Sequence, residues 1–318
     1  MNIELLIKGK GEKIFQPVIA GDIVWETERR GNPSKLTFTI LKDSIISFPE
    51  GAPVNLRIDG KGVFIGYVFQ KSRDKNQQIQ VVCYDQLRYF KNKDIYLYTN
   101  KTASEVLRMI ANDHGFQLGT VEDTGYKIAR RLENMNTLFD IVLNALDLTA
   151  YNTKKLFVLY DDFGKICLRN IESMKLDLLV ESDTLENFDY SSSIDEDTYT
   201  KIVLIQGKDN KPYVAPKSAS KEMEQWGTLT YMDKVNDDIN AQEMANQLLS
   251  LKNRKTKTLT LKGAFGDLRV RAGTSINVHL NLGDAIENRM LVCENVTHYF
   301  NADFHTMDIS MRDGTSYV

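Results

Sequence analysis

The chain has 318 residues, a length typical of two or three domains. Its residues are 42% hydrophobic and 26% charged, a composition that supports buried apolar cores. Forty basic residues stand against 43 acidic ones, and the net charge of −3 argues against a protein that holds nucleic acid mainly by electrostatic attraction. The sequence has neither an apolar run of about 18 residues nor a signal-peptide pattern, so we expect synthesis in the cytoplasm and no stable membrane insertion.

Three cysteines, Cys83, Cys167 and Cys293, lie far apart, and each falls within an apolar strand pattern. An odd, unclustered set of cysteines argues against a disulfide framework or a zinc knuckle. We therefore expect buried thiols that behave as small hydrophobic side chains.

Residues 1–92 are predicted to form a β unit, because apolar and polar residues alternate with the period of a half-buried strand. The predicted strands cover 36–40, 54–58, 63–69 and 79–84. The polar stretch 72–78 is predicted to be a hairpin loop.

Residues 93–182 are predicted to form a small α+β domain. Thr102 and Glu105 make a capping box at the start of a helix that Gly115 ends, and a second helix is predicted over 137–148. A hairpin follows, with strands 156–160 and 165–171 on either side of a turn. The turn contains Asp-Phe-Gly at 162–164, but the other protein-kinase motifs are missing, so a tight turn is favoured over a metal site.

Residues 183–318 are predicted to form a second β unit. The segment 207–227, with Pro212 and Pro216, is predicted to be a loop excursion, and a helix is predicted over 240–252. The last four predicted strands cover 268–272, 276–280, 291–299, with an irregularity at 294–295, and 306–311.

The two β units share a plan, in which a glycine-containing turn precedes an alternating strand: Gly51 before Val54, and Gly273 before Ile276. This similarity suggests an internal repeat, although any two small antiparallel sheets could look alike at this level. The predicted fold is mainly β, with two curled sheets separated by an α+β insert.

The search for chemistry is mostly negative. His114, His279, His298 and His305 form no metal-binding helix motif, and Asp195-Glu196-Asp197 is best explained as a solvated turn. No Walker loop, dinucleotide fingerprint or nucleophile elbow is present in the sequence. We therefore predict no catalytic residues, no cofactor and no metal, although a pair of carboxylates brought together by folding stays open.

Several stretches together resemble a known family. They are Ser34-Lys35-Leu36-Thr37-Phe38, Phe48-Pro49-Glu50-Gly51-Ala52-Pro53-Val54, the segments 63–68 and 83–90, Glu222-Met223-Glu224-Gln225-Trp226-Gly227, 272–278, and the hairpin from 296–298 to 306–308. In order and spacing they resemble the baseplate hub proteins of contractile phage tails. The nearest resemblance is to hub proteins of PBSX-type prophages and phage-tail-like bacteriocins. Late-control D proteins and the hub half of type VI secretion spikes are more distantly similar.

This resemblance implies two tube-type β-barrel domains, forming a pseudo-repeat and separated by an inserted domain, in a non-enzymatic structural protein. It also implies a short helix ending in an aromatic-Gly pair at 222–227. The implied domains are 1–92, 93–182 and 183–318. The implied partners are two further copies in a homotrimer, the tail tube protein, a tail spike or spike carrier, and other baseplate proteins. The implied location is the baseplate of a virion tail or tail-like particle, where a trimer of a twofold repeat joins a sixfold tube to a threefold spike.

Two other classes stay open at this point. A small barrel that binds oligonucleotides or sugars would need exposed aromatic and basic side chains on one face. The dense basic run Arg254-Lys255-Thr256-Lys257 is better explained as the flank of a helix C-terminus. A peptidoglycan hydrolase of the tail tip would need a catalytic constellation, and we find none in the sequence.

Overall fold

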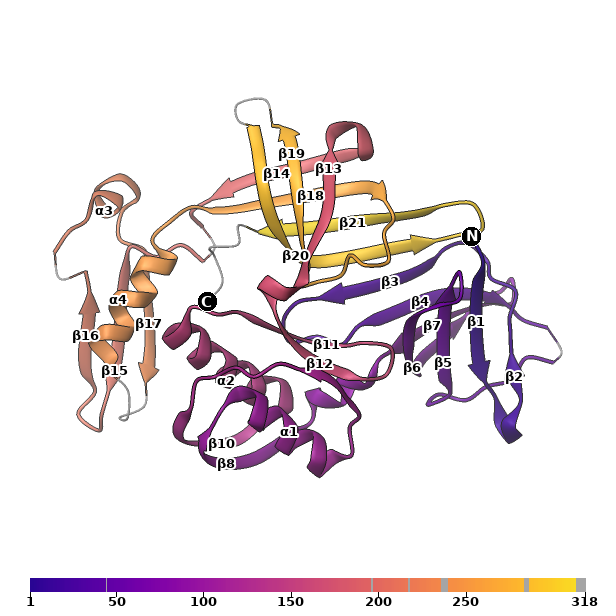
Figure 1. The fold of residues 1–318 in the computed structure, drawn as a ribbon, viewed down its shortest axis with the longest axis horizontal. Coiled ribbons are helices and arrows are strands. Elements are labelled where there is room, and N and C mark those ends of the chain that lie inside the picture. The colour runs from indigo at the N-terminus through magenta and orange to yellow at the C-terminus, as the bar shows by residue number, and fades with distance from the viewer. Residues whose placement is uncertain (44, 196, 217, 236–239, 283–285, 313–318) are drawn as a thin grey trace.

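The computed structural model describes residues 1–43, 45–195, 197–216, 218–235, 240–282 and 286–312. These residues form one sheet of thirteen strands, three small sheets and four α-helices. The strands of the large sheet cross the middle and upper right of Figure 1, the α+β insert lies below them, and a further small unit lies to the left. Among the described residues, no helix is long and apolar enough to cross a membrane.

The N-terminal half of the large sheet surrounds a first hydrophobic core that contains Leu36, Phe38 and Ile40, all essentially inaccessible to solvent. The four strands predicted here are confirmed as β4 to β7. The strands of this half are β1 (Ile3–Lys8), β2 (Ile14–Phe15), β3 (Ile23–Glu28), β4 (Lys35–Leu41), β5 (Pro53–Ile58), β6 (Lys61–Arg73) and β7 (Gln78–Tyr84), with a 3-10 turn η1 (Lys10–Glu12) after β1.

The C-terminal half of the sheet surrounds a second core, with Leu261, Val278 and Ile309 at its centre. Its strands are β13 (Lys175–Glu181), β14 (Asn187–Ser193), β18 (Thr256–Phe265), β19 (Ser275–Asn281), β20 (Ile286–Phe300) and β21 (His305–Arg312), with η4 (Ser182–Thr184) between β13 and β14. The irregularity predicted at 294–295 is confirmed as a shift in the register of β20 against β21.

The strand predicted at 268–272 is wrong, because residues 266–274 form turns. Leu268 packs against the N-terminal core, whereas Val270 is buried in the C-terminal core. The alternation of apolar residues therefore comes from a segment that passes between two cores and not from a strand with one buried face.

The two halves arrange their strands in the same order. Along the sheet, the N-terminal half reads β3-β4-β7-β6-β5-β1 and the C-terminal half reads β14-β18-β21-β20-β19-β13. If the six strands of each half are numbered by their order along the chain, both halves place them in the order 2-3-6-5-4-1 across the sheet. The two sets differ in the direction of one strand, since β1 is antiparallel to β5 but β13 is parallel to β19.

The long strands β6 and β20 also correspond in detail. The first part of each strand pairs with one neighbour and the second part pairs with another, and the change of partner falls at Tyr67 in β6 and at Val292 in β20. Each strand has a register shift two residues later, at Phe69 and at Glu294. No pairing among the described strands joins β1 to β3 or β13 to β14, so hydrogen bonding does not close either half into a barrel.

The insert contains two helices packed on short strands around its own core. The predicted capping box is present, with Thr102 and Glu105 satisfying each other's backbone amides, and Gly115 ends the helix in a left-handed conformation. The second helix runs to residue 153, past the predicted 148, because Thr149 and Ala150 are buried and continue its apolar face. The elements are η2 (Gln86–Lys91), β8 (Lys93–Lys101), α1 (Ala103–His114), β9 (Leu118–Val121), β10 (Ile128–Thr137), α2 (Leu138–Thr153), β11 (Phe157–Asp161), β12 (Ile166–Asn170) and η3 (Ile171–Met174).

The excursion from the C-terminal half is a folded unit with a core of its own, which includes Ile202, Leu204 and Ala245. The prediction of a loop over 207–227 is wrong, because the segment contains strand β16 and helix α3. The short helix that the family resemblance implied at 222–227 is present as α3. Pro212 misled the prediction, because it lies in an edge strand, where a missing amide proton costs little. The elements are β15 (Lys201–Gln206), β16 (Lys211–Ala215), α3 (Lys221–Trp226), β17 (Thr230–Val235) and α4 (Ala241–Lys252).

Candidate functional site

The two sheet halves meet at a seam, the antiparallel pairing of β3 with the end of β20 from Asn295–Glu28 to Phe300–Ile23. Trp25 and His298 lie opposite each other in this ladder and stack with ring centroids 4.9 Å apart. The hydroxyl of Thr27 accepts a hydrogen bond from the amide of Ala272 at 3.0 Å. The seam is therefore packed and hydrogen-bonded like the interior of a single sheet.

His298 is fully buried within the seam. Its Nε2 lies 2.8 Å from the carbonyl oxygen of Val270, which can only accept, so this nitrogen carries the proton. Its Nδ1 then accepts a hydrogen bond from His305 Nε2 at 2.9 Å. Burial lowers the pKa of His298 to about 3, with the neighbouring His305 as a smaller cause, and burial also lowers the pKa of His305.

Arg271 joins the two sheet halves to the insert. Its guanidinium lies 4.0 Å from the ring centroid of Tyr160 in the insert and 5.9 Å from that of Trp25 in the N-terminal half, and it donates to the carbonyl oxygen of Asp161 at 2.9 Å. Burial lowers the pKa of Arg271, while Tyr160 and the carboxylates of the cluster oppose this shift. One side chain in the C-terminal half thus contacts all three parts of the protein.

Two buried carboxyl groups accompany Arg271. Asp85 accepts hydrogen bonds from the amides of Ser34 and Leu87, both at 2.9 Å, and Asp161 accepts from the Gln86 side chain at 2.6 Å and from the Gly164 amide at 2.7 Å. Burial raises the pKa of both carboxyl groups. Their carboxyl oxygens accept hydrogen bonds from backbone and side-chain donors where the N-terminal half meets the insert. We therefore assign both carboxyl groups a structural role.

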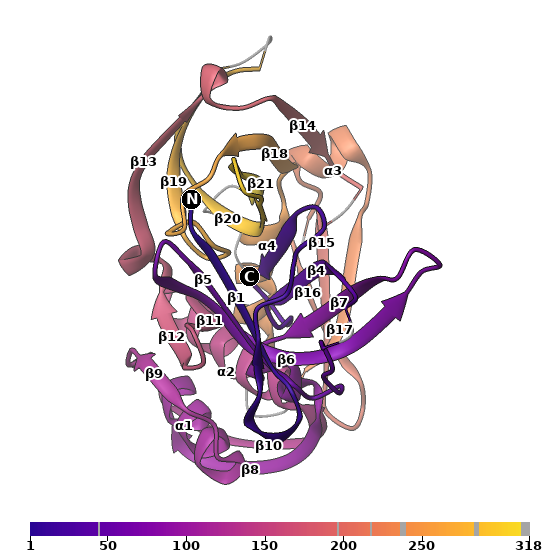
Figure 2. The same cartoon turned by 90° about the vertical axis from the view of Figure 1, so that its right-hand side faces the viewer.

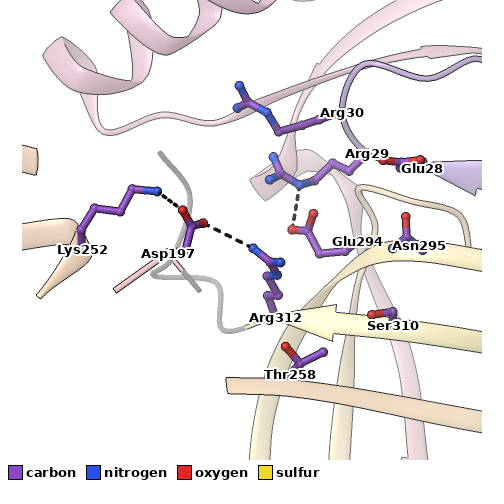
Figure 3. Close-up of a pocket in the computed structure, with 10 residues that line it drawn as sticks. All are labelled: Glu28, Arg29, Arg30, Asp197, Lys252, Thr258, Glu294, Asn295, Ser310 and Arg312. Carbon is purple, nitrogen blue, oxygen red and sulfur yellow. Dashed lines mark hydrogen bonds and ion pairs between the residues drawn. The ribbon is translucent and has the colours of Figure 1, made fainter. Parts of the chain in front are cut away.

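A charged pocket of about 380 Å³ opens at the end of the seam (Figure 3). Arg29 Nε pairs with Glu294 at 2.8 Å, and Arg30 makes a bidentate pair with Asp147 of helix α2, both bonds 2.9 Å long. On the opposite wall Asp197 pairs with Lys252 of helix α4 at 3.1 Å. Arg312 of β21 lies 3.7 Å from Asp197, so ion pairs around the pocket connect the large sheet to the segment before β15, while Arg30 connects it to the insert.

One face of the large sheet is polar across both halves, and we call it the polar face. The Cα pairings place its side chains in continuous rows, because partners in adjacent strands point to the same side. One such row contains Asp189, Thr260, Ser310, Asn295 and Glu28, and another contains Asp308, Thr297, Glu26, Lys35 and Tyr84. Lys35 and Glu26 form an ion pair at 2.7 Å on this face.

Of the described residues considered as candidates in the sequence, His298 and His305 contact each other beneath Val270, whereas the other candidates lie apart from them. The Asp-Phe-Gly turn of the insert contacts the N-terminal half, since the Arg57 guanidinium lies 4.8 Å from the ring centroid of Phe163. His114 Nε2 lies 3.3 Å from a carboxylate oxygen of Asp94. Glu196, in the acidic run, lies outside the described residues. The three cysteines are buried and free, as predicted. Within the described ranges, no group of three or more His, Cys, Asp or Glu side chains could hold a metal ion.

Sequence reasoning missed Arg271 and the Trp25–His298 stack. Arg271 lies in the segment whose strand prediction is wrong, and the partners of both features are distant in sequence. In the basic run, Arg254 and Lys255 lie in the connection after helix α4, and Thr256 and Lys257 begin β18, so the run does not form a helical face.

Solved structures of other proteins share this fold. A 43 kDa tail protein of prophage MuSo2 from Shewanella oneidensis has a TM-score of 0.70 at 15% identity, with 97% of this chain and 98% of that chain covered. The E. coli c3393 protein has a TM-score of 0.58 at 11% identity, with 100% of this chain and 78% of that chain covered. It is described as a type VI secretion component similar to bacteriophage T4 tail proteins gp27 and gp5. The fold is therefore one that phage tail proteins adopt.

The family follows from the sequence comparison. The model of the family described as YQBQ-like matches residues 23–312, and the chain belongs to this family. Protein XkdQ of the phage-like element PBSX of Bacillus subtilis (strain 168) is 31% identical over 304 residues, which cover 92% of each chain. The predicted resemblance to PBSX-type prophage proteins is confirmed.

Substitution of Arg271 by alanine tests its joining role. We expect Arg271→Ala to lower the free energy of unfolding by about 2–4 kcal/mol, because it removes the contacts of the guanidinium with Tyr160 and Trp25 and leaves the buried carbonyl oxygen of Asp161 without this donor. Urea titration followed by tryptophan fluorescence measures this, since Trp25 is adjacent. The control is Arg269→Ala, which removes a 60% exposed side chain paired with Asp267 and should have a much smaller effect, because solvent screens an exposed ion pair. Equal effects of the two variants would contradict the assigned role.

The buried His298 predicts a specific dependence of stability on pH. Because its folded pKa is about 3 and an unfolded histidine titrates near 6.5, the unfolded chain binds more protons between these values. Stability should therefore fall as the pH is lowered from about 7 to about 5. His298→Phe should reduce this loss, whereas substitution of the exposed His279 by glutamine should leave it unchanged. Urea midpoints at the two pH values measure it, and identical pH dependence in all three proteins would refute the assignment.

Proposed function

We propose that this protein is the structural baseplate hub of a contractile phage tail or tail-like particle. It would form a trimer that joins a sixfold tail tube to a threefold spike. The observation that carries the proposal is the shared strand order of the two sheet halves. Two similar units per chain in a three-membered ring present six similar faces, and this matches the two symmetries.

The matched irregularities of β6 and β20 support the idea of two tube-type units. A β-bulge is a feature that twists and bends a strand locally, and two unrelated sheets have no reason to place one two residues after the same change of partner. The similarity of this fold to phage tail proteins also supports the proposal.

The proposed domains are a first unit over 1–92, an insert over 93–182 and a second unit over 183–318. Separate hydrophobic cores in each part support this division. We amend the boundary so that the insert ends before β13, because β13 pairs with β19 of the second unit. The β15–β17 unit with helix α4 is an excursion of the second unit.

We further propose that the polar face lines the bore of the ring. Both acidic and basic side chains lie on this face, and several of them are paired, as in Lys35–Glu26 and Lys262–Asp189. Such a surface stays hydrated without presenting a strong field of one sign to a polymer that passes along it. In this arrangement the tube protein, the spike or its carrier and the other baseplate proteins contact the rims of the ring.

The proposal treats the protein as a non-enzyme of the tail, located in the baseplate of the particle. The buried acids Asp85 and Asp161 are engaged by structural donors, which favours a structural role over a peptidoglycan hydrolase. A zymogram with peptidoglycan should show no clearing. Lysis that a single carboxylate substitution abolishes would overturn this part of the proposal.

The trimeric arrangement is tested on the assembled particle. We expect averaged images of tail tips that contain this protein to show three copies between the sixfold tube and the spike. Multi-angle light scattering of the purified chain over a range of concentrations should show trimers at the highest ones. Dimers without any threefold view would contradict the proposal.

A further inference from the structure

Two strand edges of the large sheet have no partner among the described strands. Strand β14 pairs only with β18, so its other edge is open. Strand β6 pairs with β5 as far as Tyr67, and the backbone of Val68 still bonds to Gly51 and Ala52. Beyond Val68 the same edge has no partner among the described strands over 69–73. Figure 2 shows this part of β6 in a hairpin with β7 that projects from the body of the protein. Open edges of this kind are templates for pairing with another chain.

The seam inside the chain shows how such edges can be filled. There β3 pairs antiparallel with the free part of β20, beyond the point where β20 leaves β19. In the shared strand order, β14 occupies the place of β3 and β6 occupies the place of β20. The two open edges are therefore the counterparts of the two edges that already pair at the seam.

The pairings fix which residues correspond. The register shifts show that Phe69 of β6 corresponds to Glu294 of β20. Three residues further along each strand, Ser72 corresponds to Thr297. The same correspondence extends through the pairing of β7 with β4 and of β21 with β18, where Thr37 corresponds to Thr260. Val24 pairs with Thr37 and Asp189 pairs with Thr260, so Asp189 corresponds to Val24. Continuing along β14, Tyr190 takes the place of Trp25, and Ser191 that of Glu26.

We propose that β14 of one copy pairs antiparallel with residues 70–73 of β6 in the next copy, in the register of the seam. Ser193 then lies opposite Gln70, Ser191 opposite Ser72, and Tyr190 opposite Arg73. This inference rests on the proposed trimer and names its subunit contact. The sheet of each chain continues into the sheet of the next, and the ring closes without an open edge at these positions.

The side chains at the proposed contact fit one another. Tyr190 opposite Arg73 sets an aromatic ring against a guanidinium, in the place where Trp25 stacks on His298 at the seam. Ser72 and Ser191 are both exposed and polar, and both belong to the polar face. The β6 end also carries the basic residues Arg73 and Lys75, whereas β14 and the turn before it carry the acidic Asp189 and Glu186.

A second copy is the occupant because the two edges complement each other and lie on the same chain. Two different surfaces that bind each other make a head-to-tail contact, which closes into a ring when the rotation allows. A partner with a single matching strand would fill one edge and leave the other open. The contact also reproduces a pairing that this chain already makes within itself.

Disulfide cross-linking tests the contact and its register. In the double variant Ser72→Cys, Ser191→Cys, the paired Cα atoms should lie roughly 5 Å apart, within the range that a disulfide bridges. Under mild oxidation we expect covalent dimers and trimers and no larger species. The control is Ser72→Cys, Ser193→Cys, which moves one thiol by two residues to a diagonal separation of about 7–8 Å and should cross-link at least about fivefold less. The native cysteines are buried and should not compete.

The outcomes separate this inference from the proposed function. Trimers by light scattering with no more cross-linking than in the control would overturn the strand pairing and leave the trimeric hub standing. A chain that stays monomeric at the highest soluble concentration and forms no cross-link would overturn both. Cross-linked chains that extend beyond three copies would contradict closure of the ring.

Discussion

The structure depends on the antiparallel pairing of β3 with the end of β20, which joins residues about 270 positions apart in the sequence. Without this ladder the chain would consist of two separate sheets, each with an exposed edge. With it, thirteen strands share one hydrogen-bonded surface. The entropy cost of joining the two ends of the chain is offset by burial of Trp25, Phe300 and His298 at the seam, in addition to the backbone hydrogen bonds.

The insert is held against this sheet by an apolar cluster that contains Val158, Ile171 and Val292, and also by buried polar contacts. Arg271, Asp161 and Asp85 form a cluster in which the carboxylates accept backbone or amide hydrogen bonds, and the guanidinium lies against aromatic rings. Buried ionic groups add little net stability compared with apolar packing, but an arrangement that leaves one of them unpaired is costly. This asymmetry explains how such a cluster can fix the orientation of the insert relative to both sheet halves.

Local structure was predictable because short-range patterns decide it. The alternation over 36–40 and 54–58 placed β4 and β5, and the Thr102–Glu105 capping box placed the start of α1, since each depends on residues a few positions apart. The errors have equally local causes. Pro212 suggested a loop because the sequence does not reveal that its strand lies at an edge, and 268–272 imitated a strand because it packs against two cores in turn.

The sequence by itself determined the mainly β class, the insert with its capped helices, the buried state of the cysteines and the resemblance to phage tail proteins. Each of these follows from periodicity or from motifs that are read in order along the chain. Only the tertiary structure decided that the two sheet halves share one strand order, that β3 joins β20, and that Arg271 and His298 lie at their junction. The physical reason is that strand neighbours and buried polar partners are chosen by packing between distant segments, and sequence patterns do not encode which edge meets which.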